Sequence, residues 1–358
     1  MCSESIGVIA LAPAASDARV LVLPELRLES GRMLRQVPVS YQTWGALNKR
    51  GDNVVVICHA LTGDTNAAAW WPKLVGPGRA VDTDKLFVIC ANTLGSPYGS
   101  ASPITLNVDT GQNFGSAFPG VTIRDTVTAH RVLLRHLGVK RVASVIGGSM
   151  GGMLALEWGF HRDLVRSFVV IAAGGQHSPW SIAWGEAQRQ AIYADPDYQD
   201  GAYPEDRPPV RGLSVARMMA MVSYRSSGEF ADRFGRSRSA DGFEVESYLH
   251  HQGSKLNGRF DANCYVSLTQ QMDTHDVGRG RGGYEKALDS LPQPALVVGI
   301  RSDVLYPLHE QVELASLLPG GRLEVLSSPF GHDSFLVDHA GLAEIVLPFL
   351  NQFVYPYS

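Results

Sequence analysis

The sequence has no long apolar run, no block of charge of one sign and no basic cluster. No stretch reaches the roughly 18 consecutive apolar residues of a membrane-spanning helix. Lys+Arg number 31 and Asp+Glu 35, a formal net charge of -4, so nothing favours binding to nucleic acid or to a membrane surface. The N-terminal stretch MCSESIGVIALAPAASDARV has only a short apolar part, preceded by a glutamate instead of Lys or Arg. This composition argues against a signal peptide.

Cysteine is also scarce, and its spacing excludes common cysteine motifs. The four cysteines are Cys2, Cys58, Cys90 and Cys264, with no C-x-x-C pair and no zinc-binding pattern. Cys58 and Cys90 lie in apolar, strand-like runs, so we expect buried, reduced thiols. The sequence therefore predicts a cytoplasmic protein.

What the sequence does contain is a series of short apolar strands separated by helical patterns. These strands lack polar–apolar alternation, which is typical of a parallel sheet buried on both faces. Helical patterns at Ile123–Leu137 and Met150–Gly159 lie between strands, so we expect a mostly parallel, doubly wound α/β sheet. The predicted strands are Val54–Cys58, Leu86–Cys90, Val142–Ile146, Phe168–Ala172, Ala295–Ile300 and Leu323–Leu326.

This alternation breaks between about Gln176 and Leu291. The interrupting stretch has helical segments such as Leu213–Ser223 and Asp261–Gln271, and strand signals return at Ala295. We therefore expect a core made of residues 1–176 and 291–358. Residues 177–290 would form a helical lid inserted over a pocket at the carboxyl edge of the sheet.

One serine lies in a glycine-rich turn after a predicted strand. Gly147-x-Ser149-x-Gly151, between a strand and a helix, fits a nucleophile elbow, in which small neighbours let the serine adopt a strained backbone. The amide of Met150 would then lie at a helix N-terminus, where an oxyanion is favoured. A phosphate-binding turn is the alternative, but the sequence has neither G-x-G-x-x-G nor a Gly-Lys-Ser/Thr ending.

A serine nucleophile needs a base and a group that orients the base. Asp303 follows the strand Ala295–Ile300 in RSDVLYP, and His332 follows the strand Leu323–Leu326 in SSPFGHDSF. Both would lie at the sheet edge where Ser149 emerges. We predict the triad Ser149, Asp303 and His332.

Other histidines are weaker candidates for the base. His130 and His136 lie on an amphipathic helix, where structural roles are expected, and His59 follows an early strand. His275 and Asp276 lie in the insertion, where packing or a lid role is expected. The last two could mimic a metal pair, but no further ligands occur at suitable spacing, so no metal site is predicted.

The loop CHALTGD follows the strand Val54–Cys58. An early strand–helix loop supplies a second oxyanion amide in enzymes with such an elbow. By position we assign the backbone N–H of Leu61 to this role, beside that of Met150.

Taken together, these motifs resemble those of the homoserine O-acetyltransferases, a branch of the α/β-hydrolase superfamily. The resemblance runs from about Leu26 to Phe349. It implies an α/β-hydrolase fold with a helical lid and a ping-pong reaction, in which the serine takes an acetyl group from acetyl-CoA and passes it to L-homoserine. The matching segments include CHALTGD, TIRDTVTAHRVLLRHLGV, GGSMGGMLALEW, GLSVARMMAMVSYRS, FDANCYVSLTQQMDTHDVGRGRGG and GHDSF.

The resemblance also implies substrate-binding residues. Arg217 would hold the amino-acid carboxylate with Tyr224 beside it, and Asp333 would hold the ammonium group. Each has a simpler interpretation: Arg217 as a buried ion-pair partner, Tyr224 as a packing aromatic, and Asp333 as a helix cap.

Further expectations follow from the resemblance. Acetyl-CoA would be a co-substrate with no tightly bound cofactor, the role would be in methionine biosynthesis, and a homodimer would form through the insertion. Alternatives keep the same machinery: serine as acceptor, succinyl-CoA as donor, a secondary-metabolite alcohol as acceptor, or plain ester hydrolysis. A catalytically idle binding module is a further alternative, disfavoured by the intact Ser–Asp–His order.

Overall fold

A computed structural model of the chain describes residues 17–240 and 242–357. The N-terminal stretch considered above as a signal peptide, with Cys2, lies outside the described residues. A single eight-stranded sheet runs through the molecule in the order β1-β2-β6-β3-β9-β10-β13-β14. Its strands are β1 (Arg19–Arg27), β2 (Met33–Trp44), β3 (Val54–Cys58), β6 (Phe87–Ala91), β9 (Val142–Gly148), β10 (Phe168–Ile171), β13 (Ala295–Ile300) and β14 (Gly321–Leu326).

The six predicted strands are confirmed and pair in parallel with one another. Sequence reasoning missed β1 and β2, which join the sheet in antiparallel fashion, β2 against β6. Val20 and Val22 of β1 are 46% and 48% exposed, because this edge hairpin buries only one face. Exposure alternates along Val20–Leu23 of β1, whereas β3 is buried along its whole length. The sheet is therefore mostly parallel.

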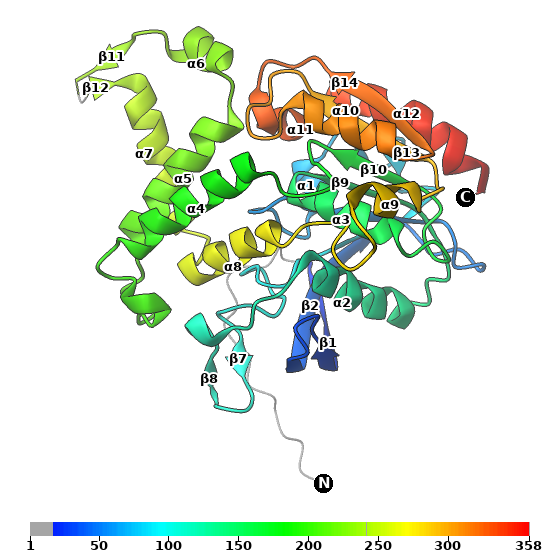
Figure 1. Ribbon diagram of the computed structural model, residues 1–358, viewed down its shortest axis with the longest axis horizontal. Helices are drawn as coiled ribbons and strands as arrows, with labels where there is room; N and C mark the ends of the chain where they lie inside the picture. Colours follow the sequence, from blue (N-terminus) through cyan, green and yellow to red (C-terminus); the bar gives the residue numbers. More distant parts are fainter. Residues whose placement is uncertain (1–16, 241, 358) are drawn as a thin grey trace.

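Helices cover both faces of the sheet (Figure 1). In β3, Val54 and Val56 pack with the helices on one face, whereas Val55 and Ile57 pack on the opposite face. This alternation of burial is what a doubly wound sheet requires. On the first face lie α2 (Ile123–His136), α3 (Met150–Gly159), α9 (Tyr284–Asp289) and α10 (Leu308–Leu317). On the second lie α1 (Ala67–Trp70) and α12 (His339–Phe353).

The helical insertion separates β10 from β13, and Figure 1 shows its helices α4–α8 beside the sheet. At its base the two chain segments pair: the N–H of His177 donates to the carbonyl of His275, and the N–H of Val277 to that of Gly175. The predicted helix 213–223 lies within α5. The predicted helix 261–271 comprises Asp261, the N-cap of α8, and most of α8 itself. The insertion contains α4 (Pro179–Tyr193), α5 (Val210–Tyr224), α6 (Ser227–Phe234), β11 (Arg238–Ser239), β12 (Gly242–Phe243), α7 (Glu244–Asn257) and α8 (Ala262–Asp273).

The remaining elements are short. They include the helix α11 (Ser334–Val337) and four two-residue strands: β4 (Val75–Gly76), β5 (Val81–Asp82), β7 (Leu106–Asn107) and β8 (Gln112–Asn113). Within the described part of the chain, no helix is long and apolar enough to span a membrane. Cys58, Cys90 and Cys264 are buried free thiols, which confirms the expectation for Cys58 and Cys90.

Candidate active site

Ser149 occupies the turn between β9 and α3 in a conformation that ordinary residues avoid. Its φ of 58° and ψ of -125° lie outside the allowed regions for L-residues. A β-carbon on Gly147 would lie 2.0 Å from the carbonyl oxygen of Gly151, and one on Gly151 would lie 2.1 Å from that of Cys58. The glycines are therefore required for the turn to close. Ser149 N–H donates to the carbonyl of Ile171 (2.9 Å), which ties the turn to β10.

The loop after β3 lies against the first turn of α3, as the close approach of Gly151 to Cys58 shows. The residues Ala60–Gly63 form a tight turn, closed by a hydrogen bond from Gly63 N–H to the Ala60 carbonyl (2.9 Å). Among the residues that the structure describes, no acceptor pairs with the N–H of Leu61. Met150 is the first residue of α3, so its N–H has no intrahelical acceptor. Two backbone donors are thus available beside Ser149.

Asp303 and His332 lie in the loops after β13 and β14, at the same edge of the sheet. His332 Nδ1 is 2.7 Å from Asp303 Oδ2. The other carboxylate oxygen, Oδ1, accepts hydrogen bonds from the N–H groups of Leu305 (2.8 Å) and Tyr306 (2.9 Å). These bonds fix Asp303, and through it the imidazole ring. His332 Nε2 is buried and has no hydrogen-bond partner within the described residues.

The surroundings of His332 favour its protonated form. Burial lowers the pKa of His332, but the charge of Asp303 and its hydrogen bond, with a contribution from Asp333, outweigh burial and raise the pKa above its ordinary value. The Tyr306 ring stacks on the imidazole with centroids 5.1 Å apart, and the Tyr224 ring lies 5.6 Å away. The ring is thus held in one orientation with Nε2 left free to exchange a proton.

A cavity of about 530 Å³ brings most of the predicted site residues together. Its walls come from the loop after β3, the elbow, the loop after β14 and the insertion helix α5. Met150 and Asp303 do not line it; they are buried directly behind Ser149 and His332. The predicted residues that line it are Leu61, Ser149, Arg217, Tyr224, His332 and Asp333.

Arg217 projects from α5 into this cavity without an anionic partner. Its guanidinium carbon lies 5.6 Å from the centre of the Tyr224 ring. In residues 17–240 and 242–357 no carboxylate lies within ion-pair distance of Arg217, whereas the nearby Arg225 pairs with Asp333 and Glu229. The interpretation of Arg217 as a buried ion-pair partner is therefore wrong. Burial raises the pKa of Tyr224 to about 12, so its hydroxyl stays protonated.

Asp333 lies on the cavity wall next to His332. Arg225 Nε is 3.3 Å from Asp333 Oδ2. Burial raises the pKa of Asp333, and the charge of Arg225 opposes the shift. Asp333 directly precedes α11, but its side chain makes no capping hydrogen bond. The helix-cap interpretation of Asp333 is therefore wrong.

Three other histidines weighed from the sequence have structural contacts, and the fourth, His136, is exposed on α2. His130 Nε2 lies 3.1 Å from the Asn92 carbonyl and His275 Nε2 lies 3.0 Å from the Gly174 carbonyl, both in buried positions. His59 lies under the Ala60–Gly63 turn. None of the three lines the cavity.

Sequence reasoning missed several cavity residues, chiefly Arg259, Tyr98 and Asp64. Arg259 Nη1 donates to the Thr62 carbonyl (2.8 Å) and to the Tyr98 hydroxyl. Asp64 lies in the CHALTGD loop, and its Oδ1 accepts from Asn66 N–H (2.8 Å). Arg259 and Thr62 are far apart along the chain, so no local spacing could reveal their contact.

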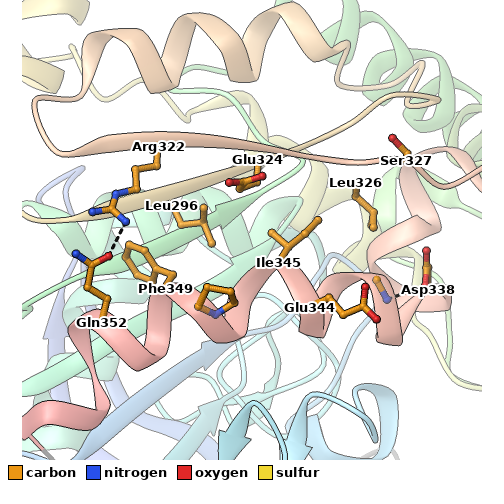
Figure 2. A pocket seen from close by; sticks show the side chains of 12 residues that line it. Leu296, Arg322, Glu324, Leu326, Ser327, Asp338, Glu344, Ile345, Phe349 and Gln352 are labelled. Carbon is orange, nitrogen blue, oxygen red and sulfur yellow. Dashed lines mark hydrogen bonds between the residues drawn. The ribbon is translucent and has the colours of Figure 1, made fainter.

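A second cavity of about 530 Å³ lies between β14 and α12 (Figure 2). Arg322 donates to the Gln352 side chain across it (2.7 Å), and Glu324 and Glu344 also line it. No residue of the Ser149 cavity lines it. Its lining residues include no histidine and no cysteine, so it lacks the Ser–His pair of the other cavity.

Comparison with known proteins agrees with this geometry. Residues 53–339 match the alpha/beta hydrolase fold family. The homoserine O-acetyltransferase of Salinibacter ruber is 59% identical over 338 residues, covering 92% of this chain and 96% of that protein. The homoserine O-acetyltransferase of Chlorobium luteolum is 51% identical, covering 90% and 91%.

Solved structures give two kinds of neighbour. The crystal structure of homoserine O-acetyltransferase from Bacillus anthracis has a TM-score of 0.86 at 26% identity, covering 94% of this chain and 98% of that one. Esterase E22 has the same TM-score, 0.86, at 26% identity, covering 93% and 99%. With a relative 59% identical over almost its full length, this chain belongs to the homoserine O-acetyltransferase family of acyltransferases, built on the alpha/beta hydrolase fold.

Proposed function

We propose that this protein transfers an acetyl group from acetyl-CoA to the side-chain hydroxyl of L-homoserine, through an acetyl ester on Ser149. One observation carries the proposal: a single cavity contains Ser149, His332 and the guanidinium of Arg217, which has no carboxylate partner in the described part of the chain. The first two suit acyl transfer, and the third suits an acceptor that bears a carboxylate.

In the first half-reaction, His332 Nε2 takes the hydroxyl proton as Ser149 Oγ attacks the thioester carbon. The N–H groups of Leu61 and Met150 stabilise the resulting oxyanion. When the tetrahedral intermediate collapses, the carbon–sulfur bond breaks, and the proton on His332 passes to the CoA sulfur. Asp303 stays ionised and stabilises the transient imidazolium, which its 2.7 Å hydrogen bond to Nδ1 favours.

In the second half-reaction, the homoserine hydroxyl attacks the acetyl-serine while His332 takes its proton. The same two amides stabilise the second oxyanion, and collapse returns the proton to Ser149 Oγ. Release of CoA before the amino acid binds makes the mechanism ping-pong. Acetyl-CoA is thus a co-substrate, and no step requires a tightly bound cofactor.

The amino-acid acceptor is held by its two charged groups. Arg217 pairs with the carboxylate, Tyr224 lies beside it, and Asp333 receives the ammonium. A bound ammonium would favour the ionised form of Asp333, against the burial that raises its pKa. The carboxylate thus supplies the negative charge that Arg217 lacks within the described residues, and the ammonium joins Arg225 as a positive charge beside Asp333.

Ester hydrolysis is the second candidate, supported by the likeness to esterase E22. The two activities differ only in whether water or an amino-acid hydroxyl attacks the acyl-enzyme. Single-turnover measurements of the acetylated enzyme, with and without homoserine, separate them. Hydrolysis without acceptor as fast as transfer with homoserine would contradict the transferase proposal.

The donor and acceptor are tested by a CoA-release assay that crosses acetyl-CoA and succinyl-CoA with homoserine, serine and no acceptor. We expect the fastest release with acetyl-CoA and homoserine. Faster release with succinyl-CoA or with serine would replace the corresponding substrate in the proposal.

We also propose that the protein acts in the cytoplasm, in methionine biosynthesis, as a homodimer joined through the insertion. Val215 and Val222 on α5 are 45% and 44% exposed, and such apolar side chains suit a subunit contact. Light scattering after size-exclusion chromatography tests the dimer, and substituting both valines by aspartate should yield monomers.

A further inference from the structure

Arg259 links the helical insertion to the turn that carries the proposed oxyanion donor. It lies just before Asp261, the N-cap of α8, so it belongs to the insertion. Its guanidinium donates to the Thr62 carbonyl (2.8 Å) and to the hydroxyl of the buried Tyr98. No carboxylate within the described ranges forms an ion pair with it. The hydrogen bonds of Arg259 therefore go to loops of the core, whereas Arg217, in the same cavity, packs against the Tyr224 ring.

The Ala60–Gly63 turn is supported from its other side by the core. His59 Nε2 accepts a hydrogen bond from the N–H of Thr93 (3.0 Å), so the ring proton is on Nδ1, which donates to the Ala60 carbonyl (2.8 Å). Burial lowers the pKa of His59, which keeps this neutral arrangement. The Ala60 end of the turn is thus fixed by the core.

The Thr62 end depends on the insertion. Its carbonyl receives the Arg259 guanidinium, and Leu61 lies between the two fixed carbonyls of Ala60 and Thr62. A turn fixed at both ends has few backbone orientations open to its central peptides. Without Arg259, the Thr62 carbonyl would face the cavity, and the turn could rotate to hydrate it. The Thr62 carbonyl and the Gly63 N–H belong to one planar peptide, and the Gly63 N–H donates to the Ala60 carbonyl (2.9 Å). Rotation at Thr62 would therefore weaken the hold on the Ala60 carbonyl. The Leu61 N–H shares its peptide plane with that carbonyl, so it would no longer be held toward the reacting carbonyl.

We propose that Arg259 is a positioning residue that fixes the Ala60–Gly63 turn so that the Leu61 N–H points toward the oxyanion. The inference rests on the proposed function, because it assumes acyl transfer through Ser149. In this proposal Arg259, a residue of the insertion, already acts in the acylation step, before any acceptor binds. The insertion would therefore contribute to the chemical step as well as to acceptor binding. An arginine suits this role because its planar fork can donate to two oxygens at once.

The test measures acylation without CoA or acceptor. The burst of p-nitrophenolate from p-nitrophenyl acetate reports attack by Ser149, and the inhibition constant of phenylboronic acid reports binding of a tetrahedral adduct. For Arg259→Gln we expect the burst rate to fall by about 10- to 100-fold, less than or equal to the loss of one oxyanion donor. The boronic acid should bind more weakly by a similar factor. Arg259→Lys should recover part of both losses.

Arg162→Gln is the matched control, because Arg162 also donates to a backbone carbonyl, that of Ser290 (3.3 Å), but is exposed and remote from the cavity. It should retain the wild-type burst and inhibition. Tyr98→Phe removes the second hydrogen-bond acceptor of Arg259, and we expect a smaller fall in burst rate and boronic acid affinity. This variant keeps the proposal testable if Arg259→Gln does not fold.

The outcomes separate the two proposals. A wild-type burst that Ser149→Ala abolishes supports the proposed nucleophile. If that burst is present, but folded Arg259→Gln keeps a burst rate and boronic acid affinity within twofold of wild type, the role of Arg259 is overturned alone. A lower melting temperature with unchanged burst and inhibition also overturns it, because that pattern marks a purely structural residue.

Discussion

The sheet core and the helical insertion contribute different kinds of group to the same cavity. The core contributes Ser149 and His332 from loops at strand ends, with Asp303 buried behind them. Backbone hydrogen bonds hold Ser149 and Asp303, and the Asp303 carboxylate holds the His332 ring. The insertion contributes the guanidinium groups of Arg217 and Arg259, carried on or next to helices. The core therefore sets the type of reaction. Under our proposals, the insertion would set which acceptor enters and, through Arg259, how the oxyanion is held.

The largest expected effect is in the core. Ser149→Ala removes the nucleophile, and we expect CoA release from acetyl-CoA and homoserine to fall by about 10⁴-fold or more, as for other serine triads. The melting temperature, measured alongside, should not fall. Activity close to wild type would refute the assignment of Ser149.

Asp303→Asn should come next, with kcat lower by about 10³- to 10⁴-fold because His332 loses its orientation and its stabilising charge. The pH profile adds a second readout. His332 must be neutral to take a proton, so kcat/KM falls as the pH drops through its pKa. Asp303 raises the pKa of His332, so removing its charge should lower that pKa. The fall of kcat/KM on the acid side should therefore occur at lower pH in Asp303→Asn than in the wild type. An unchanged acid limb would contradict this coupling.

In the insertion, Arg217→Gln should raise the KM for homoserine by about 10- to 100-fold, the size expected for a lost charged hydrogen bond. Initial-rate kinetics with varied homoserine measure it. Arg207→Gln, exposed in the loop that leads into α5 and paired with the surface Asp197, is the control and should keep the wild-type KM. An equal change in both variants would mean that α5 acts through its fold rather than through the carboxylate contact.

The smallest effect is expected from a core residue outside the cavity. Thr122 caps α2 in a reciprocal capping box with Asp125. Thr122→Ala should lower the free energy of unfolding by about 1 kcal/mol while kinetics stay the same. Denaturant titration and the CoA assay together check this. A kinetic defect would show that core residues far from the strand ends also affect the site.

The sequence was informative where local pattern determines geometry. Strand, turn and helix are contiguous around Ser149, and Asp303 and His332 directly follow their strands, so parallel pairing brings their loops to one edge. The antiparallel β1 and β2 escaped notice because each contains a proline, and β2 mixes polar with apolar residues, unlike the uninterrupted apolar run of β3. The contact of Arg259 with Thr62 escaped notice because it depends on how the insertion folds back. Such packing has no signature in residue spacing.

The left-handed backbone at Ser149 has a consequence for natural variation. A residue with a β-carbon in that conformation is strained by roughly 1–3 kcal/mol, whereas glycine adopts positive φ freely. Ser149→Gly should therefore make the protein more heat-stable while abolishing its chemistry. Selection for stability alone would favour glycine at this position, so we expect serine to persist here only where its hydroxyl is needed for activity.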